Sequence, residues 1–190
     1  MGYVGSKPSA VPLTSADITD GIITSAKIAD GTIVNADINA SAAIAQSKIT
    51  GSFGKVLQVV QATDSTARST SSSSFVTAST TLSTSITPSS TSNKILILAS
   101  VVINGTTSGQ NNLWTVTRGG TNLDGGTYGF GRNRVSASDS IMRQSVSYLD
   151  SPSSTSSLTY DVRIRNADGG TTEINTNSAT GTLILMEIAG

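Results

Sequence analysis

The sequence predicts a mainly β protein with an N-terminal repeat-built trimeric stalk, followed by an antiparallel β-sandwich head domain that is jelly-roll-like. Three observations predict this fold class. Large apolar residues recur every five positions in the first quarter of the chain. In the rest, short Val, Ile and Leu runs alternate with Ser-, Gly- and Asn-rich clusters, as in strands and loops. No segment has a convincing helical pattern. We therefore expect a peptide over residues 1–12, a stalk over 13–51 and the head over 52–190.

The stalk is predicted from a repeat of about ten residues, each made of two fives. Successive blocks begin with Ser15-Ala16-Asp17-Ile18, Ser25-Ala26-Lys27-Ile28 and Asn35-Ala36-Asp37-Ile38. After a one-residue slip the spacing of five continues to the end of the repeat. The predicted stalk core is therefore Leu13, Ile18, Ile23, Ile28, Ile33, Ile38, Ile44 and Ile49.

A spacing of five suits neither regular secondary structure. On an α-helix five residues advance about 500°, so successive isoleucines step about 140° around the axis. On a strand an odd spacing places them on alternating faces. The chain must turn once per repeat instead, and Asp20-Gly21 and Asp30-Gly31 are suited to tight turns.

One isoleucine per five residues is too little to build a core in a single short chain. Three copies wound around a common axis would place three isoleucines in each layer, so we expect an intertwined trimer. Ala16-Asp17-Ile18 and Ala36-Asp37-Ile38 also match the pentapeptide-repeat pattern, but a solenoid of that kind needs more coils than this segment supplies. A short pentapeptide-type coil and a flexible linker are the alternatives, although disordered linkers are poor in isoleucine.

The repeat stops and the composition changes around Gly51-Ser52-Phe53-Gly54, which predicts a boundary near residue 52. Short strand-like runs separated by turn-forming clusters indicate an antiparallel sandwich or jelly roll. The expected strands are 55–61, 74–78, 82–86, 94–103, 113–118, 141–149, 158–165 and 182–188.

Two of these runs, Ile95–Leu98 and Leu183–Met186, are apolar on successive residues and hence on both faces. We interpret them as candidate subunit contacts, the alternative being central strands covered on both sides within one chain. Trp114 is expected in the core. The alternation of Tyr160–Arg165 places Asp161, Arg163 and Arg165 on one face, which is predicted to be solvated or an interface.

The segment Gly119–Asp139 brings aromatic and arginine side chains together on a predicted loop. Such side chains stack on sugars and donate hydrogen bonds to polar polymers. The receptor-binding candidates are Tyr128, Phe130, Arg132 and Arg134, and the alternative is that the aromatics complete the core or a subunit interface. The segment Asn104–Asn112 is predicted to be an exposed hairpin loop.

Composition excludes several functional classes. The chain has no cysteine and no histidine, so disulfides, Cys/His metal sites and thiol or histidine catalysis are absent. Twelve basic residues balance twelve acidic residues, which gives no long-range field for nucleic acid. No run reaches the roughly 18 apolar residues of a membrane span, and the first residues lack the apolar core of a signal peptide. We expect synthesis in a cytoplasm and no nucleic acid, membrane insertion, metal or cofactor.

The opening Tyr3–Pro8, the Ala-Asp-Ile and Asp-Gly-Thr-Ile repeats and the segments Ser147–Pro152 and Leu185–Ile188 resemble fibre proteins of tailed bacteriophages, particularly those of marine and cyanobacterial hosts. The resemblance covers nearly the whole chain. It implies a homotrimer on the virion surface, anchored through its N-terminus on a capsid or tail protein, with a distal domain that meets the host. The anchoring candidates are Tyr3, Val4, Pro8 and Pro12. The short chain favours a head fibre on the capsid or an accessory tail fibre.

The function expected is a non-enzymatic structural and adhesive fibre that attaches to the host surface, with a cell-surface glycan as a possible receptor. Capsid decoration without receptor binding is the alternative. A polysaccharide-cleaving fibre would need paired carboxylates. Glu173 and Glu187 are the only glutamates, and five aspartates are dispersed in loops and strand ends without a compelling pair, at Asp124, Asp139, Asp150, Asp161 and Asp168.

Overall fold

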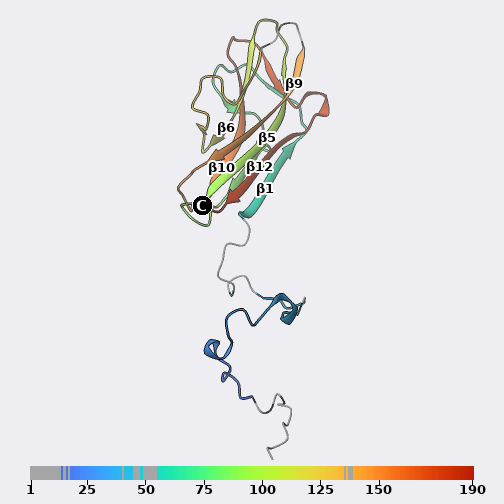
Figure 1. Ribbon diagram of the computed structural model, residues 1–190. Helices are drawn as coiled ribbons and strands as arrows, with labels where there is room; N and C mark the ends of the chain where they lie inside the picture. The colour runs from blue at the N-terminus through green and yellow to red at the C-terminus, as the bar shows by residue number, and fades with distance from the viewer. Residues whose placement is uncertain are drawn as a thin grey trace, which may run out of the picture. The chain divides into compact units, whose positions relative to one another are not determined.

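The structure is a computed structural model that describes residues 14, 16, 18–39, 41–44, 48, 55–134, 136 and 139–190. The chain divides into two compact units, Met1–Gly51 and Ser52–Gly190 (Figure 1). The division lies where the five-residue spacing ends in the sequence. Six predicted positions lie outside the described residues: Tyr3, Val4, Pro8, Pro12, Leu13 and Ile49.

Tight turns recur at ten-residue intervals in the first unit. The turns Thr19–Ile22 and Ala29–Thr32 each close with a backbone hydrogen bond from the fourth residue to the first, at 3.2 and 3.1 Å. The third residue of each turn is glycine, Gly21 with φ 80° and Gly31 with φ 77°. A type II turn requires this left-handed φ at that position, and glycine adopts it without steric cost. The predicted Asp-Gly turns are therefore confirmed.

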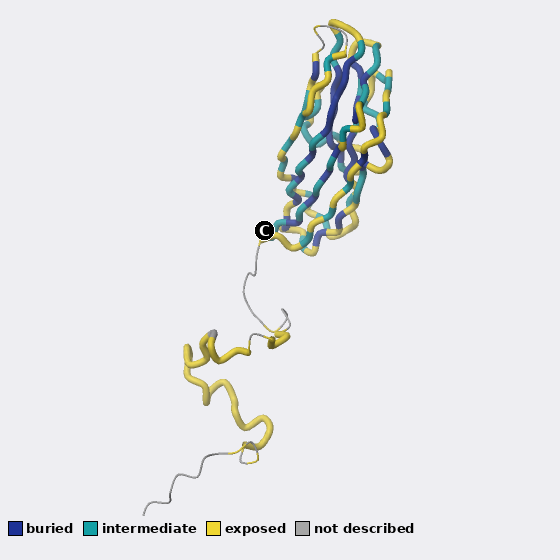
Figure 2. Tube along the Cα trace, turned by 90° about the vertical axis from the view of Figure 1, so that its right-hand side faces the viewer, coloured by how far each residue is buried: buried dark blue, intermediate teal, exposed yellow. Residues whose placement is uncertain are grey.

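Short 3₁₀ helices follow the turns, again ten residues apart, at η2 (Ser25–Lys27) and η3 (Asn35–Asp37). The described part of this unit does not fold back into a coil that covers its isoleucines, and Figure 2 shows it exposed. The exposed fractions of the predicted stalk residues lie between 38% and 55% for Ile18, Ile23, Ile28, Ile33, Ile38 and Ile44.

The second unit is mainly β, as predicted. Apart from the 3₁₀ helix η5 (Thr176–Ser178), its described elements are all strands. They are β1 (Val56–Asp64), β2 (Arg68–Thr70), β3 (Val76–Thr77), β4 (Ser83–Ile86), β5 (Lys94–Gly105), β6 (Asn111–Arg118), β7 (Thr121–Asn122), β8 (Gly131–Arg134), β9 (Ser140–Asp150), β10 (Leu158–Asn166), β11 (Thr172–Ile174) and β12 (Gly181–Ile188).

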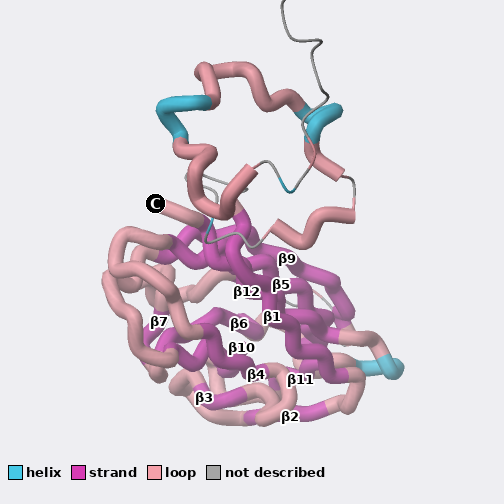
Figure 3. The backbone as a smooth tube through the Cα atoms, turned by 90° about the horizontal axis from the view of Figure 1, so that it is seen from below, coloured by secondary structure: helices cyan, strands magenta, loops and turns pink. Residues whose placement is uncertain are grey.

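The strands form two antiparallel sheets that pack face to face (Figure 3). In sheet A, β1 and β2 share one position, β12 and β11 the next, and β5 and β9 follow. In sheet B the order is β3 and β4, then β10, β6, and finally β7 and β8. If strands that share a position are counted as one, the head has eight positions, numbered in chain order from 1 (β1 with β2) to 8 (β11 with β12). Sheet A then has the order 1-8-3-6 and sheet B the order 2-7-4-5, which is the strand order of a jelly roll.

The core lies between the two sheets and is built from alternate residues of each strand. In β5 the inward residues Ile95, Ile97 and Ile103 are fully buried, as are Val162 in β10 and Trp114 in β6. The strict alternation of strand side chains explains why one residue set supplies the core while the other faces outward. The prediction of a buried Trp114 is confirmed.

One ion pair joins the sheets across the core. Arg118 Nη1 in β6 lies 2.5 Å from Asp150 Oδ2 in β9, and the Tyr160 hydroxyl in β10 donates to the same oxygen at 2.6 Å. Burial, together with the hydrogen bond to Asp150, raises the pKa of Tyr160, so the phenol stays protonated and keeps donating. This cluster fixes the edge strand β9 against sheet B.

The first strand of the head begins at the same end at which its last strand finishes. Strand β1 pairs antiparallel with β12, with Val56 opposite Ile188. The backbone N–H of Ala189 donates to Lys55 O at 2.8 Å. The far end of the sandwich therefore holds the connection between β5 and β6.

Two loop predictions are wrong. Asn104 and Asn112, expected in an exposed hairpin loop, are buried strand residues at the end of β5 and the start of β6. Those strands also belong to different sheets, so their connection is not a hairpin. The predicted loop Gly119–Asp139 contains strands β7 and β8, both paired with β6, because short polar strands give no apolar alternation.

Candidate functional site

The outer face of sheet A carries apolar side chains that no described part of the chain covers. In the central strands β5 and β12, the inward residues Ile97 and Leu185 are fully buried. Their neighbours Leu98 and Met186 point outward and are only half-buried. The alternative that these strands are covered on both sides within one chain is therefore wrong for the described residues.

Strand register brings these outward side chains together. Val59, Met186, Leu96 and Leu149 lie opposite one another across β1, β12, β5 and β9. Figure 1 labels β1, β12 and β5 side by side. Ile184 lies opposite Leu98 in the next row with the same orientation. We refer to this set as the apolar face: Val59, Leu96, Leu98, Leu149, Ile184 and Met186.

A hollow of about 360 Å³ continues the apolar face along β12, β5 and β9. Leu98 and Ile184 line it together with small residues such as Ser100, Ser145 and Thr182. Small side chains between large ones leave room for a partner's side chains to insert, as at well-packed protein interfaces. The apolar face therefore combines uncovered apolar side chains with a hollow into which side chains of another molecule would fit.

The outer face of sheet B differs in chemistry. As predicted, Asp161, Arg163 and Arg165 share one face, and Arg163 Nε pairs with Asp161 Oδ2 at 2.9 Å. Asp161 also accepts hydrogen bonds from the hydroxyls of Thr77 and Thr117. This face is polar, with Arg163 paired to Asp161 and Arg165 donating to the backbone carbonyls of Ser73 and Thr127, so it lacks the apolar character of sheet A.

The four predicted receptor-binding residues do not form a single cluster. Arg132 lies over the ring of Tyr128 at 5.1 Å, and the exposed fraction of Tyr128 is 53%. Phe130 packs instead against the core, with its ring centroid 5.1 Å from that of Tyr148. Arg134 is exposed on strand β8. Only Tyr128 and Arg132 are therefore arranged as an exposed aromatic-arginine pair.

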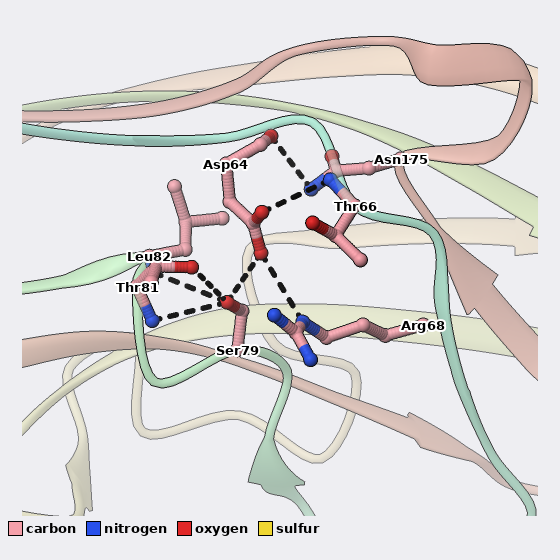
Figure 4. Close-up of polar contacts among 7 residues, drawn as sticks. All are labelled: Asp64, Thr66, Arg68, Ser79, Thr81, Leu82 and Asn175. Atoms are coloured by element: carbon pink, nitrogen blue, oxygen red, sulfur yellow. Dashed lines mark hydrogen bonds and ion pairs between the residues drawn. The ribbon is translucent and has the colours of Figure 1, made fainter.

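A buried polar network, which sequence reasoning missed, lies where β1 breaks into β2 (Figure 4). The Asp64 carboxylate accepts hydrogen bonds from Thr66 N at 2.9 Å, Arg68 Nε at 3.2 Å and the Ser79 hydroxyl. Asn175 Nδ2 donates to Asp64 O at 2.9 Å. Burial alone would raise the pKa of Asp64, but the hydrogen bonds from Ser79, Thr66 and Arg68 outweigh it and hold the pKa well below its usual range.

A second buried carboxylate anchors the end of the head where the chain enters. Glu187 accepts hydrogen bonds from Asn93 Nδ2 at 2.6 Å, Ser89 N at 2.6 Å and Gln58 Nε2 at 2.7 Å. The segment between β4 and β5 is thereby tied to β12. Like Asp64, Glu187 accepts hydrogen bonds on its carboxylate from several protein donors, so we interpret its role as structural.

The remaining carboxylates are mostly dispersed, as expected from the sequence, but two come together. Asp139 and Glu173 line the same hollow of about 480 Å³ at the far end of sheet A. Among the residues the structure describes, no group of three or more acidic side chains is arranged to hold a metal ion. Asp139 and Glu173 are separated by 34 positions in the sequence, and no local pattern links them.

Neither the protein-family models nor the curated proteins that were searched match this chain. Within the described residues, no helix has the length and apolar character needed to span a bilayer. Assignment of function therefore depends on the residues themselves.

Proposed function

We propose that this chain is a non-enzymatic structural and adhesive fibre of a tailed-phage virion. Three copies wind together through the five-residue repeat and present a trimeric β-sandwich head to the host surface. Residues 1–12 dock on a capsid or tail protein. The sequence resemblance to phage fibres suggests the setting, and the chemistry of both units supports the assembly.

The observation on which the proposal depends is uncovered apolar surface in both units. The described stalk isoleucines are all exposed in a single chain. The apolar face of the head is likewise uncovered. Burying apolar surface stabilises by roughly 25 cal/mol per Å², so both surfaces favour association.

A second copy of this chain is the occupant we propose for the apolar face. Val56 lies seven positions after Ile49 in the sequence, a span of at most about 25 Å. A trimeric stalk would therefore hold the first strands of three heads close to one axis. Strand β1 belongs to sheet A and contributes Val59 to the apolar face, so the heads would meet there at high local concentration.

Sedimentation of the full chain tests the assembly. We expect a single species of three times the chain mass at micromolar concentration. Leu96→Lys should weaken it, because lysine ammonium groups would be desolvated in the interface. Thr159→Lys is the matched control, since Thr159 is an exposed outward residue of the central strand β10 in sheet B. A wild-type chain that sediments as a monomer refutes the proposal.

Virion attachment is tested separately by deleting residues 1–12. The truncated chain should still form trimers but should no longer appear on purified particles, detected by immunogold labelling. Pro8 and Pro12 restrict the backbone of this peptide and so lower the ordering cost of docking. Normal incorporation of the truncated chain would remove the anchoring role.

Because Asp139 and Glu173 line the same hollow, we also propose a direct test for polysaccharide hydrolysis. The trimer is incubated with host capsular polysaccharide or lipopolysaccharide, and new reducing ends are counted. We expect none above the level of a Glu173→Gln variant. Release of sugar by the wild-type chain alone would replace adhesion with hydrolysis as the function.

A further inference from the structure

The far end of the outer face of sheet A is polar. Ser69, Glu173, Asn104 and Ile141 lie opposite one another across β2, β11, β5 and β9. This row lies eight residues along β5 from Leu96, or about 26 Å. It is therefore well separated from the apolar face and lies at the end of the head opposite to Val56.

Three residues of this row, Glu173, Asn104 and Ile141, line the 480 Å³ hollow, which we call the polar hollow. Its lining consists of Ala67, Asn104, Asp139, Ile141, Glu173, Thr176 and Asn177. A smaller hollow of about 160 Å³ adjoins it and shares Ala67, Glu173 and Thr176. A volume of this size suits a small organic ligand rather than a single ion.

Asn104 has an unused acceptor in this hollow. Its exposed fraction is 5%, and its Nδ2 donates to Glu173 Oε2 at 2.9 Å. Its Oδ1 accepts no hydrogen bond from any described residue, and neither does the buried Thr176 Oγ1. A buried polar atom without a partner is costly, so unpaired oxygens lining a hollow favour a ligand that donates to them.

The wall of the polar hollow is held rigidly. Of the five non-glycine residues with positive φ in the described part of the chain, four line this hollow or adjoin its lining: Asp139, Asn175, Asn177 and Ser178. Asn175 N donates to Val102 O at 2.9 Å, and Asn175 Nδ2 reaches Asp64 O in the network of Figure 4. The loop that carries Thr176 is therefore fixed at both its backbone and its side chain.

We propose that the polar hollow binds a neutral saccharide. Its oxygens are mainly acceptors, and the carboxylates of Asp139 and Glu173 disfavour acidic ligands. Sugar hydroxyls donate to such acceptors, and the exposed Ile141 side chain offers apolar contact to the C–H face of a sugar ring. Arg68, which lines the adjoining hollow, is already paired with Asp64.

This inference deepens the adhesive role proposed above by naming the ligand class and its residues. It predicts that saccharide binding belongs to the polar hollow rather than to Tyr128 and Arg132. Oligomeric state is measured independently, so a trimer that binds no sugar would refute the inference while leaving the fibre assembly intact.

The test is ¹H–¹⁵N NMR titration of the full chain with neutral oligosaccharides of glucose, galactose, mannose and N-acetylglucosamine. Oligogalacturonate serves as the acidic counterpart. We expect at least one neutral oligosaccharide to shift the amides of Asn104, Glu173 and Thr176 saturably, with no effect of oligogalacturonate. Absence of binding across the panel, or preference for the acidic oligomer, overturns the proposal.

Variants locate the site. Glu173→Gln should weaken binding about tenfold or more, because it removes a charged acceptor but keeps the side-chain shape. Tyr128→Ala should leave the affinity unchanged, and the amide spectrum of each variant reports whether it is folded. Loss of binding in Tyr128→Ala but not in Glu173→Gln would contradict the assignment. The assignment would also be contradicted if calcium chloride alone shifted the amide signal of Asn104 and no sugar did.

Discussion

At the scale of residues, the head is stabilised by buried carboxylates that are fully supplied with donors. Burial by itself would raise the pKa of Glu187, but hydrogen bonds from Asn93, Ser89 and Gln58 outweigh it and lower the pKa to about 2. A carboxylate with a lowered pKa in the folded state adds stability above its unfolded value, which is about 4.3. That contribution is lost as the pH falls from about 4.3 toward 2.

Glu187→Gln should therefore lower the free energy of unfolding near pH 7 by about 2 kcal/mol. Glutamine keeps one acceptor oxygen, so its NH₂ group would face either the donors of Ser89 and Asn93 or that of Gln58, and it accepts from neither. The difference from the wild type should shrink as the pH falls below 4. Urea unfolding at a series of pH values measures it, with Asp139→Asn as an exposed-carboxylate control. A difference that does not change with pH would argue against an ionised Glu187.

At the scale of elements, strand β8 is fixed by the absence of a side chain. A Cβ on Gly131 would lie 2.0 Å from Trp114 Nε1 and 2.1 Å from Gln144 Oε1. These two atoms form a hydrogen bond of 2.6 Å directly over the glycine. Glycine is therefore required for β8 to pair with β6.

Gly131→Ala should cost about 1–3 kcal/mol of unfolding free energy, because the indole must move or β8 must detach. Arg134→Ala, an exposed change in the same strand, should stay within about 0.5 kcal/mol. Thermal unfolding compares the two, and tryptophan fluorescence reports the environment of Trp114. Equal stability of both variants would show that the indole has room to move.

The strands that sequence predicts best are long ones with a strong apolar pattern, namely the continuous apolar runs of β5 and β12 and the alternation of β10. The missed strands β2, β7, β8 and β11 are two to four residues long and mostly polar, so they lack the apolar alternation by which strands are recognised. The subunit-contact candidates Leu96, Leu98, Ile184 and Met186 were visible as double-faced apolar runs. The polar hollow was not visible in the sequence, because the fold brings Asn104, Asp139 and Glu173 together from distant segments.

At the scale of the whole molecule, the proposed trimer would give the first unit its core. Ile28→Asp should open the stalk, since three carboxylates would be forced into one layer without a counter-charge. Trypsin cleavage at Lys27 and Lys48 measures this in the full chain, where the head keeps the copies together. We expect the Ile28→Asp variant to be cleaved about tenfold faster than the wild type or more, which corresponds to a loss of roughly 1.4 kcal/mol of protection. The control variant Ser25→Asp should be cleaved at nearly the wild-type rate. A wild-type stalk that is cut as fast as the variant would show that its isoleucines are not shielded.

The pairing of the first and last strands of the head, with Val56 opposite Ile188, has a practical consequence. The residues before Val56 and after Ile188 both leave the head at this pole, so a graft at the other pole, placed clear of the residues that line the polar hollow, disturbs neither. The connection over residues 106–110 at that pole is accordingly the position at which an epitope or a fluorophore should be grafted for display. The same graft after Ile188 would emerge beside the junction with the repeat segment, far from the polar hollow.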